Sequence, residues 1–107
     1  MKSPPAPKHL EASGRALWAA VAGHYVLEPH HLRILQAAAE CADRAEAARV
    51  AVDRDGLMVD SPRYGSKSHP LLTVERDQRT LMARLVRDLG LDLEDVKPSR
   101  PPSRFDG

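Results

Sequence analysis

Residues 29–55 have the sequence PHHLRILQAAAECADRAEAARVAVDRD, the longest uninterrupted helical pattern in the chain. Pro29 suits a first helical turn, where its missing N–H costs no hydrogen bond, and Gly56 suits a left-handed helix end. Small or apolar residues recur here at alternating spacings of four and three, which places them on one helix face. These residues, which we call the seam, are Ile34, Ala38, Cys41, Ala45, Ala48 and Val52. We therefore predict a helix of about 40 Å whose Ala-rich middle allows a partner helix to approach closely.

A first helix is predicted before this one, over about residues 7–23. Its apolar positions repeat the same four-three spacing, and Trp18 beside them is expected to anchor the core. The corner between residues 23 and 29 is short, and short connections favour antiparallel neighbours. The first two helices are therefore expected to form a helical hairpin.

A third long helix is predicted over about residues 70–89, ending at Gly90. Leu81 and Leu85 belong to the apolar face on which it is expected to pack, and we group them with the seam. Gln78 interrupts that face, either as a polar residue that specifies the register between helices or as a residue at its margin. The charged residues 75–79 form either a solvated face or ion pairs between copies.

The segment between the second and third helices is expected to contain no regular structure beyond a brief extended piece at residues 57–59. Turn-forming residues dominate residues 60–69, which predicts a loop. The expected fold class is therefore all-α: a helical hairpin plus a third long helix. Because the core is thin and rich in Ala, we expect association with further copies of the chain to supply the missing burial.

Charge is distributed unevenly along the chain, although its net value is only +1. We predict a flexible Pro/Lys arm at residues 1–8, a helical oligomerisation domain at 9–91 and a Pro/Arg-containing tail at 92–107. Cations lie on the arm, the loop and the tail, while residues 70–96 carry a net negative charge. Basic residues interleaved with an aromatic can bind a phosphate backbone. The candidate DNA-binding residues are Lys2, Lys8, Arg63, Tyr64, Lys67, Lys97, Arg100 and Arg104.

The sequence contains no pattern typical of a metal site, a cofactor site or a catalytic centre. His30 and His31 are adjacent and diverge on a helix, and the single cysteine, Cys41, lies inside the seam. That lone cysteine fits a reducing cytoplasm, no apolar run approaches the ~18 residues of a membrane span, and the N-terminus lacks a signal-peptide core. We therefore expect a cytoplasmic protein that is not an enzyme and binds neither metal nor cofactor.

Several short elements occur together in a fixed order along the chain. They are Pro7 to Leu10, Leu17-Trp18, Glu28-Pro29 before an Ala-rich helix with Cys41 and Ala42, Asp55-Gly56, His69-Pro70-Leu71, Leu89-Gly90-Leu91 and Pro98-Ser99-Arg100. This series, covering about residues 5–104, resembles the P27-type family of phage terminase small subunits. Members of that family often begin with a longer basic arm, whereas residues 1–8 here contain only Lys2 and Lys8 as cations. This difference shifts weight to the cations of the loop and the tail.

The resemblance implies a non-catalytic, all-α subunit that assembles as a closed ring in the host cytoplasm. It implies binding to double-stranded viral DNA at the packaging initiation site, and recruitment of the large subunit that carries the ATPase and nuclease. A small helical DNA-binding regulator, such as a dimeric repressor or an antitoxin-like module, is the alternative that we retain. A structural scaffold without a nucleic-acid role is a third.

The size of the assembly separates these classes. We expect a homo-oligomer larger than a dimer, because the apolar faces of the helices exceed what one small chain can cover. Light scattering and native mass spectrometry at micromolar concentration measure this directly. A monomeric mass would contradict the expectation, and a dimer would favour the regulator.

Overall fold

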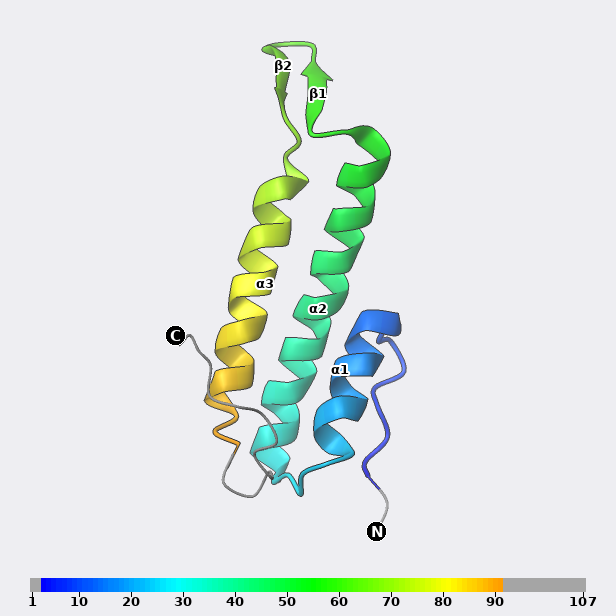
Figure 1. Cartoon of the computed structure of the whole chain (residues 1–107), viewed down its shortest axis with the longest axis vertical. Helices are drawn as coiled ribbons and strands as arrows, with labels where there is room; N and C mark the ends of the chain where they lie inside the picture. Colours follow the sequence, from blue (N-terminus) through cyan, green and yellow to red (C-terminus); the bar gives the residue numbers. More distant parts are fainter. Residues whose placement is uncertain (1–2, 92–107) are drawn as a thin grey trace, which may run out of the picture.

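The computed structural model describes residues 3–91, which form three helices and one β-hairpin (Figure 1). In chain order these are α1 (Ala12–Ala22), α2 (Pro29–Asp55), β1 (Met58–Ser61), β2 (Gly65–Ser68) and α3 (Leu71–Asp88). The long helices α2 and α3 lie side by side and antiparallel, and the β-hairpin projects from the end at which they are joined (Figure 1). The shorter α1 lies along the N-terminal half of α2, antiparallel to it. None of the helices in residues 3–91 has the length and apolar character that a bilayer crossing requires.

The boundaries of α2 are those predicted from the sequence. Pro29 occupies the first turn, and a reciprocal capping box precedes it: the Glu28 side chain accepts from the backbone N–H of His31, and Nδ1 of His31 accepts from the N–H of Glu28 at 3.2 Å. Gly56 ends the helix with φ +89°, a conformation that residues with a Cβ rarely adopt. Local signals at both ends therefore suffice to define this element.

The main apolar core lies where α1 packs against the N-terminal half of α2 and the end of α3. Its buried members are Leu10, Trp18, Val21, Ala22, Leu35, Ala39 and Leu89. Trp18 anchors this core as predicted, and its indole N–H donates to the carbonyl of Pro4 at 3.0 Å. Of the seam, Ile34 is half-buried and packs against the same cluster.

The start of α1 differs from the prediction, because the helix begins at Ala12 rather than near residue 7. The carboxylate of Asp43, on α2, accepts from the N–H of Gly14 at 2.6 Å and from the N–H of Glu11 at 2.7 Å. A side chain from another helix thus satisfies N–H groups that the first turn leaves unpaired. A Cβ on Gly14 would lie 2.6 Å from Oδ2 of Asp43 and 2.7 Å from the carbonyl oxygen of Ala39, so this close approach requires glycine.

The remaining seam residues of α2 lie in the packing of α2 against α3. Ala38, Cys41, Ala45, Ala48 and Val52 are all buried. Beyond Asp43, where α1 begins, α3 is the helix that lies alongside α2 (Figure 1). Small side chains at this contact allow the two helix axes to approach closely. Whether the seam also meets a second copy stays a prediction.

The packing face of α3 is rotated from the expected one. Residues that are half-buried recur at alternating spacings of four and three, with a fully buried residue at the end of the row. They are Leu71, Glu75, Gln78, Met82, Leu85 and Leu89. Val74 and Leu81 lie outside this row, 37% and 40% exposed, so Leu81 does not belong to the core of the single chain. The sequence misled because two of the inward positions are polar.

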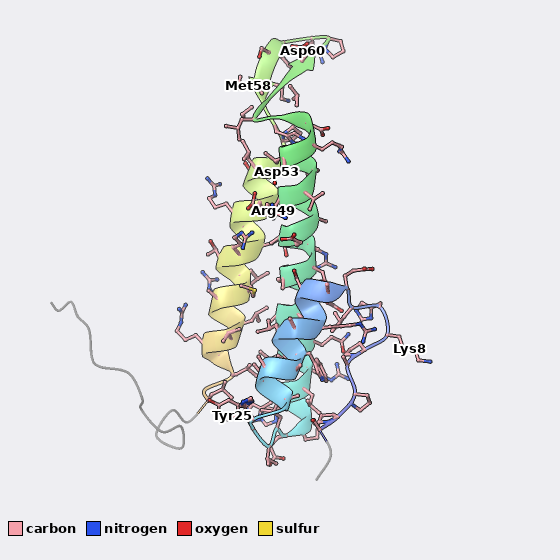
Figure 2. All side chains as sticks on the ribbon, turned by 45° about the vertical axis from the view of Figure 1, so that its right-hand side comes forward. Lys8, Tyr25, Arg49, Asp53, Met58 and Asp60 are labelled. Carbon is pink, nitrogen blue, oxygen red and sulfur yellow. The ribbon has the colours of Figure 1, made fainter. Side chains whose placement is uncertain are left out.

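One of those polar positions, Glu75, belongs to a set of ion pairs along one edge of the α2–α3 contact. Arg49 pairs with Glu46 and Asp53 at 2.7 Å each, and Arg79 pairs with Glu75 at 3.2 Å. Figure 2 shows Arg49 and Asp53 on the part of α2 that lies beside α3. These pairs lie within one chain. Because they are largely solvated, they contribute little to stability.

The all-α prediction needs one correction, since residues 58–68 form a β-hairpin where a loop was expected. Met58 pairs with Ser68, Val59 with Lys67, Asp60 with Ser66 and Ser61 with Gly65. The prediction failed because β2, Gly-Ser-Lys-Ser, has none of the alternation of apolar residues that indicates a strand. The described chain is therefore mostly helical rather than all-α.

The close contact of α2 and α3 can be tested by overpacking. Ala45 is 2% exposed, so we expect Ala45→Leu to reduce the free energy of unfolding by about 1–3 kcal/mol, because the added atoms force the helices apart. Ala47→Leu, two residues away and exposed, is the matched control and should change stability by less than about 0.5 kcal/mol. Urea denaturation measures both. Equal stability of the two variants would show that α3 does not approach α2 at Ala45.

Candidate nucleic-acid interface

The turn of the β-hairpin is organised by one serine hydroxyl. Oγ of Ser61 accepts from the N–H of Arg63 at 3.3 Å and from the N–H of Tyr64 at 3.2 Å. Gly65 follows with φ +71°, which lets the chain reverse into β2 without the steric cost that a Cβ would add. The side chains of the turn are thereby left free to face solvent.

The β-hairpin brings together three of the predicted DNA-binding residues. Arg63 and Tyr64 lie in the turn and Lys67 lies on β2, and all three are exposed. The guanidinium carbon of Arg63 is 5.8 Å from the ring centroid of Tyr64, within the range of a cation–π contact. Tyr64 itself remains 71% exposed. The hairpin also carries one acid, Asp60, and so presents a net charge of +1 from its described residues.

The base of the hairpin is held by His69, which the sequence placed in the loop without a role. His69 is 6% exposed, and its Nε2 lies 2.9 Å from Oδ2 of Asp55 at the end of α2. Its Nδ1 accepts from the N–H of Leu71 at 3.1 Å, at the start of α3. Because Nδ1 accepts, Nε2 carries the proton and donates to Asp55. The backbone N–H of His69 donates to the carbonyl of Leu57 at 2.7 Å.

The pKa of the Asp55 carboxyl lies well below its usual value. Hydrogen bonds from the Arg54 guanidinium, at 2.8 and 3.0 Å, are the largest cause, and the hydrogen bond from His69 is the second. Both donors stabilise the ionised carboxylate. Asp55 therefore holds its charge at the base of the hairpin at neutral pH.

Lys8 lies apart from the hairpin cations. Figure 2 shows its side chain extending from the outer side of the N-terminal segment, away from the helices. That segment is tied down: Arg15 donates to the carbonyls of Leu10 and Lys8 at 2.9 and 3.0 Å. Nε2 of His9 lies 2.8 Å from Oε2 of Glu40, midway along α2. On one chain, Lys8 therefore lies far from Arg63 and Lys67, and the three cations do not form one surface.

Four of the predicted residues, Lys2, Lys97, Arg100 and Arg104, lie outside the described residues. Within residues 3–91, no group of three or more His, Cys, Asp or Glu side chains is placed to hold a metal ion.

Of the predicted DNA-binding residues that the structure describes, Arg63, Tyr64 and Lys67 lie together, at the tip of the β-hairpin.

A family model described as phage terminase, small subunit, matches residues 14–100 of the chain. The chain belongs to this family. The match runs from the first turn of α1 through the β-hairpin and α3, and it confirms the resemblance seen in the sequence. Small subunits of this family are generally non-catalytic, so membership confirms that this terminase subunit is not an enzyme. No curated protein and no solved structure matches the chain.

The depressed pKa of Asp55 makes a prediction for stability against pH. A carboxyl with a lower pKa in the folded state stabilises that state above its unfolded value, 3.8, and loses this contribution as the pH falls below it. We expect the free energy of unfolding to decrease from about pH 5 downward, and Asp55→Asn to flatten part of that decrease. Arg54→Gln, which removes the strongest donor, should also flatten it. Urea denaturation across pH measures the effect, and parallel curves for all three proteins would contradict it.

Proposed function

We propose that this small subunit is a DNA-packaging adaptor that acts in the host cytoplasm during phage assembly. In this role it binds double-stranded viral DNA at the packaging initiation site and recruits the large subunit that carries the ATPase and nuclease. The observation that carries the proposal is the family match over residues 14–100. It includes all of α2 and α3 and all but the first two residues of α1. No catalytic step is assigned to the subunit.

We further propose that the subunit acts as a ring-shaped homo-oligomer. Support comes from apolar surface that a single chain leaves uncovered. No residue of α3 between Leu71 and Asp88 is fully buried, and Val74 and Leu81 on that helix are substantially exposed. Val50 on α2 is 48% exposed in addition. Surface of this kind on a chain with a thin core favours association with further copies.

The proposed DNA contact is the tip of the β-hairpin, with the tail cations as a second candidate. The hairpin projects beyond the helical pair (Figure 1), so Arg63, Tyr64 and Lys67 can approach a duplex without hindrance from the helices. One chain offers few cations, so a monomer should bind weakly. A ring repeats them, and simultaneous contacts can raise apparent affinity by ~10²–10⁴. Binding of this kind depends chiefly on phosphate contacts and falls steeply with salt.

A salt titration of DNA binding tests this proposal. We expect Arg63→Ala/Lys67→Ala to weaken binding to duplex DNA, with oligomer size unchanged. The log–log salt slope should flatten by roughly 0.9 for each phosphate that the variant no longer neutralises. Arg100→Ala/Arg104→Ala examines the tail in the same way.

The matched control is Arg84→Ala/Arg87→Ala, which removes two exposed cations from the end of α3 far from the β-hairpin. This variant should keep the wild-type slope. If the hairpin and tail variants both keep that slope as well, neither segment contacts DNA. A flatter slope in the control alone would place the contact on the helices.

A further inference from the structure

Packing of its own side chains contributes little to the orientation of the β-hairpin. None of the residues from Leu57 to Ser68 is buried, and β2 is exposed throughout. An isolated two-stranded hairpin is only marginally stable in water. Yet this hairpin is the element on which the proposed DNA contact depends. Its direction relative to α2 and α3 must therefore be held at its base.

At that base, His69 makes the hydrogen bonds that can fix the direction of the β-hairpin. Among the described residues it is the only polar side chain that is buried. Its two ring nitrogens make hydrogen bonds to different helices: Nε2 to Asp55 at the end of α2, and Nδ1 to the N–H of Leu71 at the start of α3. Its backbone N–H closes the base by donating to Leu57, the residue before β1. One residue thus links both helices and the root of the hairpin.

We propose that His69 is a positioning residue, whose hydrogen bond to Asp55 fixes the direction in which the β-hairpin leaves the helical pair. Arg63, Tyr64 and Lys67 are thereby held at a defined place relative to the helices. The consequence for DNA rests on the proposed function, whereas the orientation itself does not. In a ring, several hairpins gain from acting together only if each is already aimed at the same duplex, because ordering a loose hairpin on binding costs free energy.

Two substitutions of His69 separate its hydrogen bonds. His69→Asn places an oxygen near the position of Nδ1, so it can still accept from the N–H of Leu71 but cannot reach Asp55. His69→Gln places an amide nitrogen about as far from Cα as Nε2, so it can still donate to Asp55 but no longer accepts from Leu71. Asp55→Ala breaks the same link from the other side and leaves His69 and the start of α3 intact.

The direct experiment measures the distance between hairpin and helix by pulsed electron paramagnetic resonance. Spin labels are placed at Ser66→Cys on β2 and Ala47→Cys on α2, both exposed positions, in the full chain with the buried Cys41 changed to Ala. We expect a narrow distance distribution for the parent protein and for His69→Gln. We expect a distribution broadened at least about twofold for His69→Asn and Asp55→Ala. The double variant His69→Asn/Asp55→Ala should be no broader than either single one, because both remove one interaction.

DNA affinity, measured on the unlabelled proteins, is the second readout. His69→Asn and Asp55→Ala should lose affinity about 10-fold or more, with the chain still folded and oligomer size little changed, and His69→Gln should restore it. The melting temperature should fall moderately in Asp55→Ala, because the buried Nε2–H of His69 loses its acceptor. Narrow distributions in every variant would overturn the proposal, and so would a broad one in His69→Gln. If the widths change as expected but even the wild type fails to bind DNA, the positioning role stands and the proposed function fails.

Discussion

The close contact between α2 and α3 is the constraint on which the rest of the structure depends. It is made by a row of small side chains, with Ala45 and Ala48 at its centre. Small residues let the helix backbones approach closely, but they bury little apolar area per residue. The pair is therefore narrow, and the larger apolar residues of the core gather at the end where α1 packs. Val74 and Leu81 lie outside the inward row of α3 and remain at its surface.

Polar side chains define where α1 and α3 begin, which packing alone does not determine. Asp43 accepts from two N–H groups at the start of α1, and His69 accepts from the N–H of Leu71 at the start of α3. In both cases the side chain satisfies a donor that the first helical turn leaves unpaired. Because a buried, unpaired donor is costly, these bonds fix where each helix begins and how it meets its neighbour. In the same way, the hydrogen bond between His69 and Asp55 links the base of the β-hairpin to the end of α2.

The arrangement separates the part of the chain that holds the fold from the part proposed to contact DNA. Several acidic residues of α2 and α3 take part in ion pairs within their own helix, such as Glu46 with Arg49 and Glu75 with Arg79. Arg63 and Lys67 lie beyond these helices on an element that contributes no buried side chain. Substitutions there can alter a phosphate contact at little cost to the core. The family match assigns the chain to the terminase small subunits, and the exposure of Arg63 and Lys67 supports the proposed DNA contact separately.

By itself the sequence determined what depends on local periodicity and local end signals. It defined the boundaries of α2 from Pro29 and Gly56, the buried face of α2, the anchoring role of Trp18, and the ordered series of residues that the family match confirms. Only the tertiary structure decided the rest. The hydrogen bond between Gly14 and Asp43 joins residues 29 positions apart, and the one between His69 and Asp55 joins residues 14 positions apart. No local sequence pattern predicts either of them. The β-hairpin arises in a segment without apolar alternation, and the inward face of α3 includes Glu75 and Gln78. In each case a contact with another element outweighed the local preference. The spacing of neighbouring residues does not predict hydrogen bonds and packing between distant segments.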